Sequence, residues 1–176
     1  MKKIITNHYS LIVFLFLISV VVRIPQLCRP LSKHHEYCTA HMIRIMQALD
    51  ENGAIKNNFT PLMNYGGYEN KFINNNAPEK FDQNGNAYYL SYPPFTYIFP
   101  YVILKFFHTE PNVFGIRIIN LLWQFIGTVF LFKMVVLLFK MSGEEKNKKS
   151  IRAGFVAVLF FLFNPASLFF QQNLWM

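Results

Sequence analysis

The stretch that decides the fold is FGIRIINLLWQFIGTVFLFKMVVLLF, residues 114–139, in which Arg117 and Lys133 are the only charged side chains. A helix rises about 1.5 Å per residue, so this stretch is long enough to cross the roughly 30 Å hydrocarbon core of a bilayer. It therefore predicts a membrane-spanning helix near residues 113–139. The apolar runs on either side of it decide how many more such helices there are.

Two further runs, residues 9–27 and 151–170, are also predicted to span the membrane. Lys2 and Lys3 precede the first run, as they would in a signal peptide. No small-residue cleavage site follows that run, which favours an uncleaved membrane helix.

The apolar run at residues 95–107 is too short to span. It rises only about 20 Å as a helix and contains Pro100, so we interpret it as a helix lying along or partly into the membrane. Three spans, rather than four, also place the lysine-rich segment 140–152 on the same side as Lys2 and Lys3. The positive-inside rule makes that side the cytoplasm and leaves residues 28–112 as an extracytoplasmic loop.

The composition supports a membrane protein and excludes a nucleic-acid partner. Apolar residues make up 53% of the chain and charged residues 15%, whereas soluble domains carry about 25% charged residues. The net charge of +8 comes from lysines at the ends of apolar runs, with no basic helix face or RNA-binding aromatic motif. Cys28 and Cys38 could form a disulfide in an oxidising compartment or remain free thiols.

The first part of the loop predicts a helix near residues 34–50, ended by Asn52-Gly53. One face of that helix is apolar at a 3.6-residue period: Cys38, Met42, Ile45, Met46 and Leu49. The helix either lies on the membrane with this face toward lipid or the membrane helices, or packs on the rest of the loop. The whole chain is thus predicted to be one all-α membrane domain, with three transmembrane helices, two in-plane juxtamembrane helices and an irregular extracytoplasmic loop.

Glu36 is the first candidate for chemistry, because a carboxylate near the membrane can take a proton from an acceptor hydroxyl. It could also hold a divalent cation, or simply be a solvated charge that favours the helix dipole. Three histidines lie near it in the sequence, His34, His35 and His41. Their spacing favours surface or headgroup contacts over a metal site, so no metal ligand is assigned.

Two later positions are also candidates. Tyr92 precedes Pro93-Pro94, where an aromatic hydroxyl would sit at the membrane interface and the prolines fix an extended entry into the next helix. Arg117 lies near the start of the long span, where it could pair with a lipid phosphate or snorkel to the headgroups.

The order of these features resembles the C-type superfamily of integral-membrane glycosyltransferases, especially protein O-mannosyltransferases and bacterial aminoarabinose transferases. The resemblance covers nearly the whole chain and is carried by Glu36-Tyr37, Asn52-Gly53, Tyr92-Pro93-Pro94-Phe95, Arg117 and Asn164-Pro165. His35-Glu36 stands where the family has an Asp-Glu pair, and Tyr92 stands where it has a lysine.

The resemblance implies an inverting sugar transfer from a polyprenyl-phosphate donor to a lipid or protein acceptor, in a bacterial inner membrane. Glu36 would be the catalytic base, and His35, Tyr92 and Arg117 would contact the substrates, with a divalent metal left open. Family members have many more membrane helices, so the chain is expected to be an N-terminal portion that is inactive alone. The alternative is a small non-enzymatic membrane subunit whose extracytoplasmic loop binds a partner.

Overall fold

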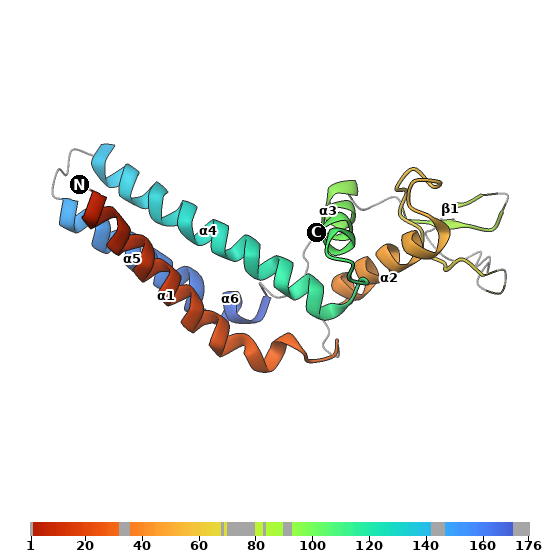
Figure 1. The fold of residues 1–176 in the computed structure, drawn as a ribbon, viewed down its shortest axis with the longest axis horizontal. Helices are drawn as coiled ribbons and strands as arrows, with labels where there is room; N and C mark the ends of the chain where they lie inside the picture. Colours follow the sequence, from red (N-terminus) through yellow and green to blue (C-terminus); the bar gives the residue numbers. More distant parts are fainter. Residues whose placement is uncertain are drawn as a thin grey trace. The chain divides into compact units, whose positions relative to one another are not determined.

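The computed structural model describes residues 2–31, 36–67, 69, 80–82, 84–89, 93–141 and 147–170. They are predominantly helical (Figure 1). The elements in chain order are α1 (Lys2–Leu27), α2 (Tyr37–Asn52), β1 (Lys80–Phe81), β2 (Ala87–Tyr88), α3 (Pro94–Phe106), α4 (Val113–Met141), α5 (Asn147–Phe163) and α6 (Pro165–Phe170). They form two compact units: a first unit of residues 1–29 and 117–172, and a second built mainly from residues 30–116.

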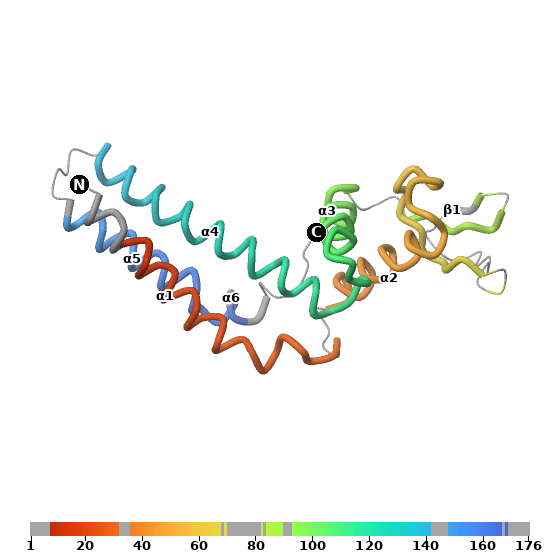
Figure 2. Tube along the Cα trace, viewed as in Figure 1, coloured from red at the N-terminus to blue at the C-terminus, as the bar shows by residue number. Residues whose placement is uncertain are grey.

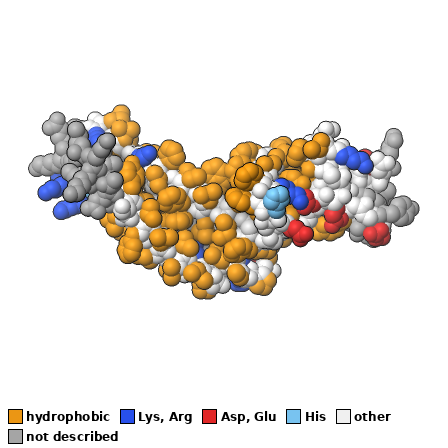
Figure 3. Space-filling model, in the orientation of Figure 1, with side chains coloured by type: hydrophobic (Ala, Val, Ile, Leu, Met, Phe, Trp, Pro, Cys, Tyr) orange, Lys and Arg blue, Asp and Glu red, His pale blue; other side chains and the backbone are white. Residues whose placement is uncertain are grey.

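In the first unit α1, α4 and α5 run side by side (Figures 1 and 2). Their shared core is the buried cluster of Ile12 from α1, Phe132 from α4, and Val158 and Leu162 from α5. Many other apolar side chains of these helices face outward, and they cover most of the visible surface over this unit (Figure 3). Such an outward-facing apolar surface suits a hydrocarbon surrounding better than water.

Among the residues that the structure describes, two helices are long and apolar enough to cross a membrane, over His8–Leu27 and Val113–Met141. They match the predicted spans at 9–27 and 113–139. The third predicted span, 151–170, is divided: α5 ends at Phe163 and α6 begins at Pro165. Proline has no N–H to continue the helical ladder, which accounts for the break. The third crossing therefore stays a prediction.

In the second unit α2 is the central helix, and α3 packs against it. Four residues of the predicted apolar face of α2 are fully buried in the protein, namely Met42, Ile45, Met46 and Leu49. The expectation that this face turns toward lipid is therefore wrong for these residues. The second interpretation, a helix packed on the rest of the loop, describes them correctly.

The second unit also contains a short hairpin in which β1 pairs antiparallel with β2, where we had expected only irregular structure. Its turn is organised by Asp82, whose carboxylate accepts hydrogen bonds from the backbone N–H groups of Asn84 and Asn86 and from the Tyr88 hydroxyl. Burial alone would raise the pKa of Asp82, but these hydrogen bonds outweigh it and the pKa is lowered. Gly85 adopts a left-handed φ of 75° in this turn, as glycine does readily.

Candidate functional site

Glu36 lies directly before the first residue of α2, at the position where a helix is capped. Its side chain is 2% exposed and makes no capping hydrogen bond to the helix. The amino end of a helix carries a partial positive charge, which favours a carboxylate there. The solvated surface charge considered as an alternative is therefore not what the structure shows, because this carboxylate is buried.

A small aromatic cluster adjoins Glu36 in the sequence and joins two distant stretches. The His41 ring centroid lies 5.4 Å from that of Tyr37 and 5.0 Å from that of Tyr89. Tyr37 directly follows Glu36, and Tyr89 lies three residues before Tyr92. The start of α2 is thus packed against the segment that leads into the Pro-Pro element. We call Glu36, Tyr37, His41 and Tyr89 the α2-start site.

The three aromatic side chains of this cluster differ in how exposed they are. His41 is buried, Tyr89 is half-buried and Tyr37 is 68% exposed. A ring that is open to the surroundings beside a buried carboxylate offers an apolar face and a hydroxyl to a substrate. His35 and Tyr92, both predicted to contact substrate, lie outside the described residues, so their roles stay predictions.

Arg117 is buried in the first unit and makes an unexpected set of contacts. One terminal nitrogen, Nη1, donates to the backbone carbonyls of Gln26, Leu27 and Arg29, at 2.5, 3.1 and 2.5 Å. The last carbonyls of a helix lack partners within the helix, and a basic side chain can satisfy them. Arg117 therefore caps the carboxyl end of α1, a structural task that the sequence did not predict. Its contact with a donor phosphate stays a prediction.

Arg23 of α1 contacts the carboxyl end of α5, a role that the sequence did not predict. Its Nη1 donates to the Ser19 carbonyl at 2.8 Å, and its Nη2 donates to the Leu162 carbonyl at 2.9 Å. The Leu162 carbonyl loses its helical partner where α5 ends, before Pro165. A charged residue inside a membrane-length apolar run was the available signal, because such residues usually have a specific partner.

A hydrogen bond and an ion pair connect α3 to α2 in the second unit. The Asp50 carboxylate of α2 accepts a hydrogen bond from the Tyr101 hydroxyl at 2.9 Å and pairs with Lys105 Nζ at 2.7 Å. Burial, together with the hydrogen bond and negative charge of Asp50, raises the pKa of Tyr101 to about 12. Because both contacts of Asp50 join α2 to α3, we assign Asp50 to structure rather than chemistry.

The described residues contain no group of three or more His, Cys, Asp or Glu placed to hold a metal ion. His34 and His35 lie outside those residues, so the open question of a divalent metal stays open. Both cysteines are free thiols, with Cys28 exposed and Cys38 half-buried.

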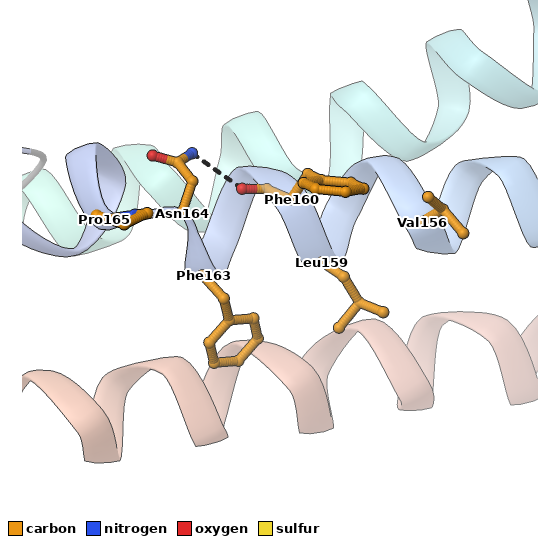
Figure 4. A pocket seen from close by; sticks show the side chains of 6 residues that line it. All are labelled: Val156, Leu159, Phe160, Phe163, Asn164 and Pro165. Carbon is orange, nitrogen blue, oxygen red and sulfur yellow. Dashed lines mark hydrogen bonds between the residues drawn. The ribbon is translucent and has the colours of Figure 1, made fainter.

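A cavity of about 580 Å³ opens where α5 meets α6 (Figure 4). It is lined by Val156, Leu159, Phe160, Phe163, Asn164 and Pro165. The Asn164 side-chain amide donates to the Phe160 carbonyl at 2.9 Å, as the dashed line in Figure 4 shows. Apart from this amide, the side chains that line the cavity are apolar, and none of them is a typical catalytic group.

Comparison with known proteins adds no identity: no family model, no curated protein and no solved structure matches this chain.

Proposed function

We propose that this chain is the N-terminal part of a membrane glycosyltransferase, which moves a sugar from a polyprenyl-phosphate donor to a lipid or protein acceptor. The observation that supports it best is the buried Glu36 carboxylate at the start of α2. Glutamate side chains are rarely fully buried, so the burial of Glu36 marks it out among the carboxylates of the second unit. The proposal makes Glu36 the general base.

The covalent connections support a position near the membrane. The second unit follows the candidate span that ends at Leu27, and it continues into the candidate span that begins at Val113. Because both ends of the second unit connect to candidate spans, a carboxylate on this unit would be held near the lipid headgroups. A polyprenyl-phosphate donor presents its reacting phosphate and sugar at that level.

In the proposed mechanism, Glu36 accepts the proton of the acceptor hydroxyl as the oxygen attacks the anomeric carbon of the sugar. The bond from that carbon to the phosphate oxygen breaks, and polyprenyl phosphate leaves with the electron pair. Attack opposite the leaving group inverts the anomeric configuration. General-base help of this kind contributes about 10²–10⁴-fold to a rate.

The two tyrosines of the α2-start site, Tyr37 and Tyr89, would line the acceptor side, where rings and hydroxyls suit a sugar or a serine-like hydroxyl. His35 and Tyr92 are proposed to contact the same substrates. Arg117 is proposed to help hold the donor phosphate, in addition to fixing the end of α1.

The test is a transfer assay on the complete protein that carries these residues, in membranes supplied with polyprenyl-phosphate sugars labelled in the sugar. Transfer of label to lipid or protein, dependent on the expressed protein, is the expected result. If no donor of the set is consumed, while the loop captures a defined protein partner, the proposal is wrong and the non-enzymatic subunit is the better account.

A further inference from the structure

Lys133 is an exposed cation inside α4, one of the two candidate membrane spans. Its Nζ atom lies 5.9 Å from the ring centroid of Tyr9 on α1 and 5.9 Å from that of Phe130, one turn earlier on α4. A lysine ammonium within about 6 Å of an aromatic ring is attracted to the face of that ring. These two contacts position the ammonium between α1 and α4, but neither of them neutralises its charge.

The contact with Tyr9 indicates how deep Lys133 would lie in a bilayer. The candidate span of α1 begins at His8, so Tyr9 is the second residue of that span and would lie where the hydrocarbon meets the headgroups, as tyrosines often do. Because the Lys133 ammonium lies over the Tyr9 ring, it would lie at the same level. Lys140 is also exposed and follows seven residues later on α4, which is two helical turns further along the same side.

This end of the first unit is strongly cationic. The amino end of α1 and the carboxyl end of α4 lie together there (Figure 1), and the sequence of residues 1–10 and 130–155 contains eight Lys or Arg against two Glu. An exposed cation at the edge of an apolar span is costly unless it meets an anion. The anions that a bilayer supplies at that level are the phosphates of its headgroups. Deeper in the span, Phe130 is 65% exposed and Val13 is 41% exposed, so acyl chains would find apolar side chains to contact.

We propose that Tyr9, Lys133 and Lys140, which we call the lysine clamp, bind a phospholipid of net negative charge in the leaflet at the amino end of α1. In a choline or ethanolamine headgroup the phosphate is already balanced by the cation of the headgroup itself. A phosphatidylglycerol headgroup has no such cation, so its phosphate charge is left for the two lysines. The Tyr9 ring would orient Lys133 toward the phosphate, and an acyl chain would lie along Phe130 and Val13.

The lysine clamp involves none of the residues that are proposed to act on the sugar donor or its acceptor. The inference depends on the membrane location of the first unit and not on sugar transfer, so the two proposals can fail separately. Because the clamp joins α1 to α4, a lipid that binds it would favour the folded first unit over the unfolded chain.

The test measures lipid binding by the full chain in mild detergent, with native mass spectrometry as the readout. The probes are phosphatidylglycerol and phosphatidylcholine with identical acyl chains at equal concentration, so that only the headgroup differs. Lys133→Gln and Lys140→Gln each remove one charge of the clamp, and Lys133→Arg keeps it. The matched control is Lys56→Gln, which removes an exposed lysine of the second unit. Melting curves in micelles free of anionic phospholipid show that each variant is folded.

We expect the parent chain to bind phosphatidylglycerol in preference to phosphatidylcholine. Lys133→Gln and Lys140→Gln should each lower the ratio of the two bound lipids about fivefold, the contribution of one lysine near an anionic lipid surface. Lys133→Arg and Lys56→Gln should keep the parent ratio. Equal binding of the two lipids by the parent overturns the proposal, and this comparison needs no variant to fold. A preference that both glutamine variants leave unchanged overturns it too, because the lipid would then be held by other cations.

Discussion

Replacing Arg117 by methionine tests the most specific structural assignment in the first unit. The Arg117 Nη1 atom serves three carbonyls at the end of α1, and the Arg117 side chain is 1% exposed. Methionine keeps most of the volume and all of the apolar stem, so packing changes little and the carbonyls lose their donor.

The expected loss follows from the contacts. A hydrogen bond to a charged group contributes about 1.5–3 kcal/mol, and each buried carbonyl left unsatisfied costs about 1–3 kcal/mol. Because a single Nη1 group has only two hydrogens to share among three acceptors, the contributions do not add fully. We expect Arg117→Met to lower the free energy of unfolding by about 2–4 kcal/mol, the range for losing one charged donor and leaving buried carbonyls without it.

The assay is thermal unfolding in detergent micelles, in the absence of any donor lipid. Lys133→Met is the matched control, since Lys133 lies on the same helix and is exposed, and among the described residues it has only ring contacts near 5.9 Å. It should change stability by less than about 0.5 kcal/mol. If Arg117→Met is as stable as the control, yet the complete protein loses donor binding, the cap assignment is wrong and the phosphate contact is correct.

Three other outcomes can be checked in the same preparation. Tyr101→Phe should cost about 1.5–3 kcal/mol, because Asp50 loses a hydroxyl donor. The pKa of Tyr101 is raised to about 12 in the folded protein, against about 10 for a free tyrosine. The stabilisation from its hydroxyl is therefore fully present below a pH of about 10 and is lost as the pH rises toward 12. The melting temperature of Tyr101→Phe should not show this fall between pH about 10 and about 12. Gly154→Ala should destabilise the first unit by about 1–3 kcal/mol, since its Cβ would lie 2.8 Å from Phe132 Cδ2. Gly127→Ala, which finds Phe161 at an ordinary 3.6 Å, should be neutral or stabilising in the same melting assay.

The helices were predictable because their signals are local. Length and hydropathy alone located α1 and α4, the two candidate spans, and the 3.6-residue period located α2. Pro94 and the turn after Phe106 bounded α3 close to the predicted range. The division of the third run at Asn164-Pro165 was visible as a proline, but whether a helix crosses a membrane beyond such a break is not a local property.

The contacts that position the site were not predictable, because they join residues far apart in the chain. The Arg117 cap spans from α4 to α1, and the Asp50 contact with Tyr101 joins α2 to α3. The apolar face of α2 was found correctly, but its partner was left open between the membrane and the rest of the loop, since periodicity shows which side is apolar and not what covers it. The role of Arg23 was not predicted, because its position inside an apolar run indicates that it has a partner but not which one.

The most direct test of the central claim compares sugar transfer by Glu36→Gln and Glu51→Gln in the complete protein. Both substitutions replace a carboxylate by an amide on or beside α2, but Glu51 is exposed and accepts a hydrogen bond from the Gly66 N–H. We predict that Glu36→Gln lowers the transfer rate by about 10²–10⁴-fold with donor binding kept, because glutamine cannot accept the proton, while Glu51→Gln transfers at the parent rate. Normal turnover by a folded Glu36→Gln protein would contradict the account and leave α2 as a structural helix.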